Sequence, residues 1–281
     1  LKILGRRPDG YHDILSILQT VDLCDALTFE EAPAGRTEIV SSDPAIPSGP
    51  ENLIHRAVTV LREATGCDRG IRVYLEKVIP AGAGLGGGSA DAAAALRVLN
   101  RAWGLRIPRS RLLEMASRIG SDVVFLVSGG TAVVSGRGEL LRGLSWSSEI
   151  HYVLIQPSFQ VSTRWAYQQA SARSGLNLTE ASKYINFISC LTDSPICARN
   201  LFACLENDFE PVVAQAWPAL HGVLRALREK GADACSMTGS GSVVYGAFFD
   251  AATAGRAAQA LRLEGHRVFR CRPWTATHED G

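Results

Sequence analysis

Residues 80–96 read Pro-Ala-Gly-Ala-Gly-Leu-Gly-Gly-Gly-Ser-Ala-Asp-Ala-Ala-Ala-Ala-Leu. The stretch follows an alternating, strand-like segment and leads into an alanine-rich segment typical of a helix. The first N–H groups of a helix have no partner within it, and the positive end of the helix dipole lies beside them. Because glycine also lets the backbone approach a ligand closely, the sequence predicts a phosphate-binding loop between strand and helix.

The segments on both sides of this loop have clear periodicity. Apolar and polar side chains alternate over residues 71–77, which predicts a half-buried strand. Helical spacing marks 52–65, stopped by Gly66, and an alanine-rich helix is expected from about 89 to 102. A further helix is expected over 108–119, with its proline in the first turn.

Residues 121–127 form an apolar segment that we predict to be strand-like, as is 131–135 beyond two glycines. Asp122, near the start of the first segment, has two interpretations. It either caps the segment, as Asp often does at such a place, or it is a carboxylate that accepts a proton from a substrate hydroxyl. The local sequence alone favours the cap and leaves both roles open.

The length of 281 residues favours two domains. We place the junction near residue 148, which gives domains of 1–148 and 149–281. The periodicity of the second domain predicts strands and helices in alternation. The strands are expected at 151–156, 243–249 and 267–271, and the helices at about 162–172, 218–230 and 251–263.

Two further segments are candidate ligand contacts. The turn 5–12 carries arginine, tyrosine and histidine, and it is either the lip of a ligand site or an ordinary solvated loop. The cluster 238–241, Thr-Gly-Ser-Gly, is either a tight turn between strands or a second small-residue loop that shares a cleft with the first.

Composition excludes several classes of protein. A formal net charge of +1 gives no reason to expect a nucleic acid partner, and no apolar run approaches the roughly 20 residues that span a membrane. Seven scattered cysteines without a C-x-x-C pair are typical of reduced thiols, so we expect a cytoplasmic protein with no zinc site. The sequence does not indicate an oligomeric state.

The glycine loop differs from the two commonest phosphate motifs. Ala92 and Ala93 stand where a G-x-x-x-x-G-K-[ST] loop needs Lys and Ser or Thr. No acidic residue ends a second strand at the distance that a dinucleotide fingerprint requires. The pattern Pro-x-x-x-Gly-Leu-Gly-x-x-Ser-Ala, which begins at Pro80, is much more specific.

On these residues, 80–94 resembles the ATP-binding motif of the GHMP kinases, small-molecule kinases of galactose, homoserine, mevalonate and related substrates. Segments 4–12, 84–90 and 119–123 resemble a branch of that family whose small-molecule substrate carries a cytidine diphosphate group. The resemblance implies an α+β, two-domain GHMP kinase fold, with an N-terminal β-α-β nucleotide domain and a C-terminal ferredoxin-like domain. It also implies ATP and Mg²⁺.

The resemblance assigns roles by position. Asp122 matches the catalytic aspartate, and Asn52 would lie near the nucleotide base. Tyr11 would stack on cytosine, His12 would hydrogen-bond its edge, and Tyr167 would close the sandwich. Thr238 and Gly239 match a glycine motif on the substrate side. The residues expected around the ATP phosphates are Pro80, Ala81, Gly82, Ala83, Gly84, Leu85, Gly86, Gly87, Gly88, Ser89 and Ala90.

Two features depart from the family pattern. The family's catalytic lysine lies in a Pro-x-Lys-x-Asn-Leu segment, which we expect upstream of Leu1, so the chain looks truncated at its start. Val124 stands where relatives usually have proline. The alternatives are another GHMP kinase, such as homoserine or mevalonate kinase, and a noncatalytic nucleotide sensor or RNA-binding module.

Overall fold

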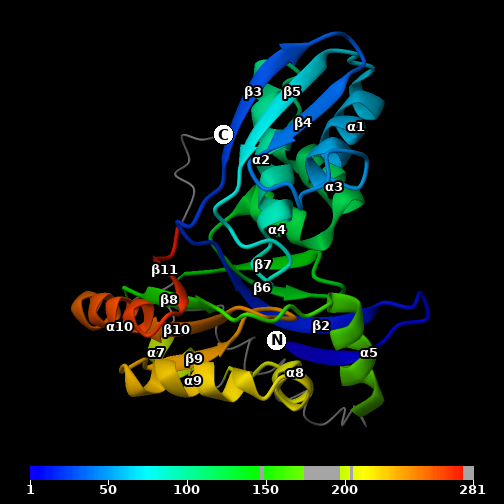
Figure 1. The fold of residues 1–281 in the computed structure, drawn as a ribbon. Coiled ribbons are helices and arrows are strands. Elements are labelled where there is room, and N and C mark those ends of the chain that lie inside the picture. The colour runs from blue at the N-terminus through cyan, green and yellow to red at the C-terminus, as the bar shows by residue number, and fades with distance from the viewer. Residues whose placement is uncertain (146–148, 174–196, 203–204, 275–281) are drawn as a thin grey trace. The chain divides into compact units, whose positions relative to one another are not determined.

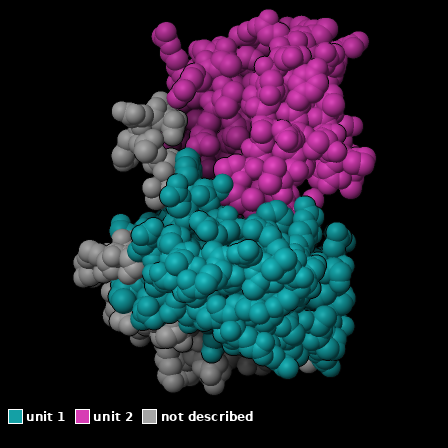
Figure 2. Space-filling view, turned by 60° about the vertical axis from the view of Figure 1, so that its left-hand side comes forward, with its two compact units in different colours: residues 1–22, 82–85, 130–275 teal, residues 23–81, 86–129, 276–281 magenta. Residues whose placement is uncertain are grey.

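The computed structural model describes residues 1–145, 149–173, 197–202 and 205–274 (Figure 1). The chain forms two compact units, coloured separately in Figure 2. The first comprises residues 1–22, 82–85 and 130–275, and the second comprises 23–81, 86–129 and 276–281. Both sides of the predicted junction near 148 belong to the first unit, and residues 146–148 are outside those described, so that domain boundary stays a prediction.

The second unit contains a β-α-β element. Its sheet has the order β3-β5-β4, with β3 antiparallel and β4 parallel to the central strand. The parallel pair requires a crossover, and α1 supplies it. Helices α2, α3 and α4 complete the layer. The bounds are β3 Ala26–Ala32, β4 Thr37–Ser41, α1 Leu53–Thr65, β5 Gly70–Glu76, α2 Gly87–Ala102, α3 Arg109–Ile119 and α4 Ser121–Ser128.

The alternation predicted for β5 is confirmed. Ile71, Val73 and Leu75 are buried, whereas Tyr74 is exposed on the other face of the strand. The predicted helix over 52–65 is also confirmed, because Asn52 caps α1 and Gly66 ends it in a left-handed conformation.

The first unit contains two antiparallel four-stranded sheets, ordered β1-β2-β6-β7 and β11-β8-β10-β9. The first sheet consists of β1 Lys2–Arg6, β2 His12–Gln19, β6 Thr131–Ser135 and β7 Leu140–Leu144. The second consists of β8 His151–Gln156, β9 Ala234–Met237, β10 Val244–Phe248 and β11 Arg267–Cys271. Within its described residues, the helices of this unit are α5 Thr163–Arg173, α7 Ala198–Phe202, α8 Glu210–Ala216, α9 Ala219–Glu229 and α10 Ala251–Leu263.

The second sheet confirms the predicted ferredoxin-like domain. Numbered along the chain, its strands follow the order 4-1-3-2, and α10 lies between the last two of them in sequence. The apolar stripe of α9 packs into the core of this unit, with Leu220, Val223, Leu224 and Leu227 all buried. None of the helices in the described part of the chain is long and apolar enough to cross a membrane.

One predicted element is wrong. The apolar segment after Asp122 is not a strand but the helix α4. Its residues Val123, Val124, Phe125 and Val127 are all buried, so the helix is apolar on nearly every side. A short, uniformly apolar run has no periodicity that separates a buried strand from a buried helix. The helix after the glycine loop also begins at Gly87, two residues earlier than predicted.

We predict that Leu227→Ala destabilises the first unit by about 2–5 kcal/mol, because it removes a fully buried side chain from the core. Leu263→Ala is the matched control, since Leu263 is 83% exposed and its loss should change stability by less than about 0.5 kcal/mol. Urea unfolding followed by far-UV circular dichroism measures both. Equal midpoints for the two variants would contradict the assigned core.

Candidate active site

The start of α2 presents free backbone donors. Its N-cap is Gly86, with φ 67 and ψ 18, and no side chain caps the helix. A residue with a side chain would be strained in this left-handed conformation, which explains glycine at this position. Among the described residues, no side chain therefore caps the first-turn N–H groups, and the helix dipole adds positive potential beside them. This arrangement can bind phosphate oxygens.

The tip of the same loop contacts the second glycine cluster. Residues 82–85 belong to the first unit, where the N–H of Val243 donates to the carbonyl of Ala83 at 3.1 Å. A side chain on Gly84 would place its Cβ 2.4 Å from the carbonyl oxygen of Thr238. The cluster also forms the turn between β9 and β10, so the turn interpretation is confirmed, and a cleft shared by the two loops stays a prediction.

Asn207 forms hydrogen bonds to the backbone of the second glycine cluster and of the residue before it. Its Nδ2 donates to the carbonyls of Met237 and Gly239, each at 2.8 Å, and its Oδ1 accepts from the N–H of Phe209 at 3.0 Å. Asn207 is 7% exposed, and both ends of its amide are used. Sequence reasoning missed this residue, because no local pattern connects it to a loop 30 residues away.

His12 and Tyr167, two predicted substrate contacts, lie together in the first unit. Their rings stack with centroids 4.9 Å apart and an interplanar angle of 22°. Tyr167 also meets Phe209 edge-on, which fixes its ring. Tyr11 is 58% exposed, and the Arg137 guanidinium lies 5.0 Å from its ring centroid. A cation over an aromatic face is attracted to it, so Arg137 restrains Tyr11.

Ser171 determines which nitrogen of His12 carries a proton. The Ser171 hydroxyl donates its hydrogen to the carbonyl of Tyr167 at 2.7 Å. The same oxygen lies 2.6 Å from Nε2 of His12, so it must accept from an Nε2–H group. In the neutral ring, Nδ1 then keeps a lone pair and acts as an acceptor. Burial, followed by the nearby charge of Arg6, lowers the pKa of His12 and favours this neutral form.

Asp122 is the second residue of α4 and does not cap it. The N-cap is Gly120, and no side-chain cap bond is present, so the structural alternative for Asp122 is not observed. Asp122 is exposed, and yet enough protein surrounds its carboxyl that burial raises the pKa. Because water screens the charge of an exposed carboxylate, solvent exposure limits this rise in the pKa of Asp122. Val124 follows within a regular helix, so α4 forms without the proline usual in relatives.

Asn52 has a clear structural role. Its Oδ1 accepts from the N–H of Ile54 at 2.8 Å, and its Nδ2 donates to the carbonyl of Pro47 at 2.7 Å. These bonds cap α1 and shape the loop before it. A contact between Asn52 and the nucleotide base stays a prediction.

In the part of the chain that the structure describes, no three His, Cys, Asp or Glu side chains gather as a metal site. A bound Mg²⁺ commonly takes one or two carboxylates, with phosphate oxygens and water as its other ligands.

Comparisons with known proteins agree with this geometry. The family models of the GHMP kinases N terminal domain and the GHMP kinases C terminal domain match residues 52–135 and 194–267. A 4-diphosphocytidyl-2-C-methyl-D-erythritol kinase from Pelotomaculum thermopropionicum is 38% identical over 269 residues, covering 96% of this chain and 92% of that protein.

Two solved structures share the fold. A 4-(cytidine 5'-diphospho)-2C-methyl-D-erythritol kinase has a TM-score of 0.75 at 30% identity, covering 98% of this chain and 95% of that one. A homoserine kinase from Cytophaga hutchinsonii has a TM-score of 0.75 at 19% identity, covering 92% and 89%, and shows the fold alone. Together with the family models and the 38% identical relative, these matches show that the chain belongs to the GHMP kinase family.

Proposed function

We propose that this kinase transfers the γ-phosphoryl group of ATP to the 2-hydroxyl of 4-diphosphocytidyl-2-C-methyl-D-erythritol, in the non-mevalonate synthesis of isoprenoid precursors. The observation that carries the substrate assignment is the bonded arrangement of His12, Ser171 and Tyr167. The 38% identical relative, whose name states this substrate, supports it.

The arrangement suits cytosine in particular. An aromatic ring offers a stacking surface, and the Nδ1 lone pair of His12 accepts a hydrogen bond. Cytosine presents an amino group on its edge, which donates to such an acceptor, whereas a pyrimidine with a carbonyl at that place presents a second acceptor. Placing two acceptors face to face leaves both unpaired, which lowers affinity. The site therefore favours cytidine over uridine compounds.

The phosphoryl groups of ATP fit the start of α2, where the N–H groups lack a side-chain cap. Mg²⁺, when bound with ATP, supplies neutralisation of charge on the phosphate oxygens. Asp122 orients the substrate hydroxyl and accepts its proton, which activates the oxygen as a nucleophile. The N–H groups of the first helical turn stabilise negative charge that develops on the transferred group.

The presence or absence of a base distinguishes the alternative substrates. Homoserine and mevalonate carry no base, so the His12 and Tyr167 pair would have no role with either. A noncatalytic nucleotide sensor would bind ATP without phosphorylating any alcohol. An RNA-binding module is typically basic, and the formal net charge of +1 speaks against it. A cytoplasmic location and the absence of a nucleic acid partner stay predictions.

The direct test measures ADP release with each acceptor in turn. We expect turnover with 4-diphosphocytidyl-2-C-methyl-D-erythritol, weak turnover with its uridine counterpart, and none with homoserine or mevalonate. Turnover with homoserine alone would overturn the substrate assignment, and ATP binding without turnover on any acceptor would favour a sensor.

We predict that Asp122→Asn lowers kcat by about 10²–10⁴-fold, because it removes the proton acceptor while keeping the shape of the side chain. Binding of ATP should stay within about twofold, since the amide leaves the start of α2 unchanged. Asp68→Asn, on an exposed loop of the same unit, is the control and should keep parental activity. A folded Asp122→Asn protein with parental kcat would exclude Asp122 from the reaction.

We also predict that Arg6→Gln raises the pKa of His12, because it removes a nearby positive charge that disfavours the imidazolium. The neutral fraction of His12 then falls as pH drops towards the raised pKa, and cytidine compounds bind more weakly under mildly acidic conditions. NMR titration of the histidine ring protons measures the shift directly. An unchanged titration of His12 in Arg6→Gln, alongside an unchanged Arg109→Gln control, would contradict the assignment.

A further inference from the structure

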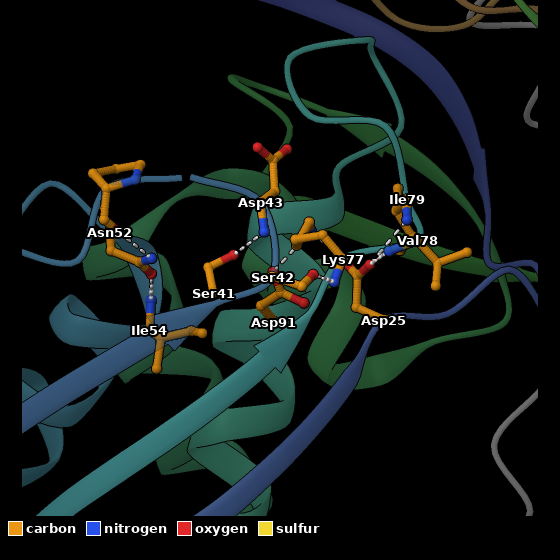
Figure 3. A network of polar contacts seen from close by, with 11 residues as sticks. Asp25, Ser41, Ser42, Asp43, Asn52, Ile54, Lys77, Val78, Ile79 and Asp91 are labelled. Atoms are coloured by element: carbon orange, nitrogen blue, oxygen red, sulfur yellow. Dashed lines mark hydrogen bonds and ion pairs between the residues drawn. The ribbon is translucent and has the colours of Figure 1, made fainter. Parts of the chain in front are cut away.

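Three charged side chains are buried together in the second unit. Asp25, Lys77 and Asp91 have side chains only 1%, 5% and 5% exposed (Figure 3). Nζ of Lys77 bonds to Oδ2 of Asp25 and lies 3.1 Å from Oδ2 of Asp91. Removing ionised groups from water is unfavourable, and well-packed apolar residues often stabilise a fold equally well. Stability alone is therefore a weak reason for this triad.

Asp25 holds the entrance of the phosphate loop. Its Oδ1 accepts from the N–H of Val78 at 2.6 Å and from the N–H of Ile79 at 2.9 Å. These residues directly precede Pro80, where the loop begins (Figure 3). One carboxylate thus binds the backbone of the loop through one oxygen and Lys77 through the other.

Lys77 and Asp91 hold the other end of the loop. Asp91 is the fifth residue of α2, so its bond to Lys77 ties the first turns of that helix to the end of β5. A Cβ added to Gly87, the first residue of α2, would lie 3.2 Å from Nζ of Lys77. The ammonium therefore sits directly against the helix start that presents its N–H groups to phosphate.

The triad carries more negative than positive charge. Burial alone would lower the pKa of Lys77, but its bonds to both carboxylates raise it, so the ammonium stays charged. Burial, together with Asp25, raises the pKa of Asp91 to about 7 against the opposing effect of Lys77. Lys77 and Asp25 are the charged groups with the largest effect on Asp91. Below that pKa Asp91 is protonated and the triad is neutral, and above it the triad has a net charge of −1.

We propose that Asp25, Lys77 and Asp91 are positioning residues for the nucleotide: they hold the two ends of the phosphate loop together, and their net charge sets the affinity for phosphate. A neutral triad favours the anionic nucleotide, and a triad of charge −1 beside the helix start opposes it. The inference rests on the proposed kinase function.

The test measures equilibrium binding by calorimetry, with two probes. A nonhydrolysable ATP analogue reports on the phosphate loop, and cytidine diphosphate reports on the His12 and Tyr167 site in the first unit. The variants are Asp25→Asn and Asp91→Asn. The control is Asp43→Asn, a residue of the same unit that accepts from the N–H of Ala45 outside the triad.

At pH 6, where the parent triad is already neutral and gains least from the loss of a carboxylate, Asp25→Asn should weaken the ATP analogue about tenfold or more, because an amide has only one oxygen to serve both the backbone and Lys77. Its affinity for cytidine diphosphate should stay within about twofold, as should both affinities of the control. Equal weakening of both probes, or parental affinity for the ATP analogue in the folded variant, would overturn the proposal.

If Asp25→Asn does not fold, Asp91→Asn still tests the proposal. We expect this variant to fold, because its amide oxygen still accepts from Lys77. It makes the triad permanently neutral, so the ATP analogue should bind more tightly than to the parent at pH 8 and equally at pH 6. Ionisation of the analogue is common to both proteins and cancels in the ratio. A parental pH profile in Asp91→Asn would overturn the proposal. A parent protein that binds cytidine diphosphate but no ATP analogue would instead remove the proposed function.

Discussion

The start of α2 has no side-chain cap on its backbone N–H donors, and several neighbouring contacts hold this helix start in place. A helix normally satisfies its first N–H groups with a side-chain cap, and α1 does so through Asn52. At α2 a left-handed glycine takes the cap position instead, and no side chain competes for the donors. Within one unit, a side chain caps the start of α1, whereas the start of α2 leaves its N–H groups for the proposed phosphate.

An uncapped helix start has to be held by other contacts. Gly87 packs against Lys77 and Ile79 so closely that a side chain there would collide with both. The loop tip around Gly84 packs against the carbonyl of Thr238 in the first unit, and Asn207 holds the carbonyls of the neighbouring Met237 and Gly239. Each contact restrains the glycine backbone without using the N–H groups of the first helical turn. The start of α2 is thereby held in place while its first-turn N–H groups keep no side-chain cap.

The sequence predicted what depends on local pattern. The helix at 251–263 and the strand at 267–271 have the predicted bounds, because apolar spacing and the flanking polar residues mark them clearly. Residues 123–127 were mispredicted, because a short apolar run has no informative period. The glycine loop was predicted as a phosphate loop from the strand, glycines and helix around it, whereas the roles of His12 and Tyr167 were reached through family resemblance, and the structure brings that pair together.

What escaped prediction depends on contacts between distant residues. Ser171 lies 159 positions from His12, and its role arises only because one hydroxyl meets both a ring nitrogen and a carbonyl. Asp25 lies 52 positions from Lys77, and in sequence it is simply an acidic residue before a strand. Arg137 and Asn207 are likewise ordinary residues until the fold places them. No spacing rule identifies such partners in a single sequence.

The His12 and Tyr167 pair has one more consequence for a catalytic cycle. Phosphorylation of a hydroxyl leaves the cytosine base chemically unchanged, so a site that reads the base holds substrate and product alike. The affinity gained at Tyr167 and His12 cannot drive turnover, and it makes the product a competitor of the next substrate molecule. Discrimination between them has to come from the end of the molecule that gains the phosphate. The proposed recognition of the base by His12 and Tyr167 therefore implies product inhibition.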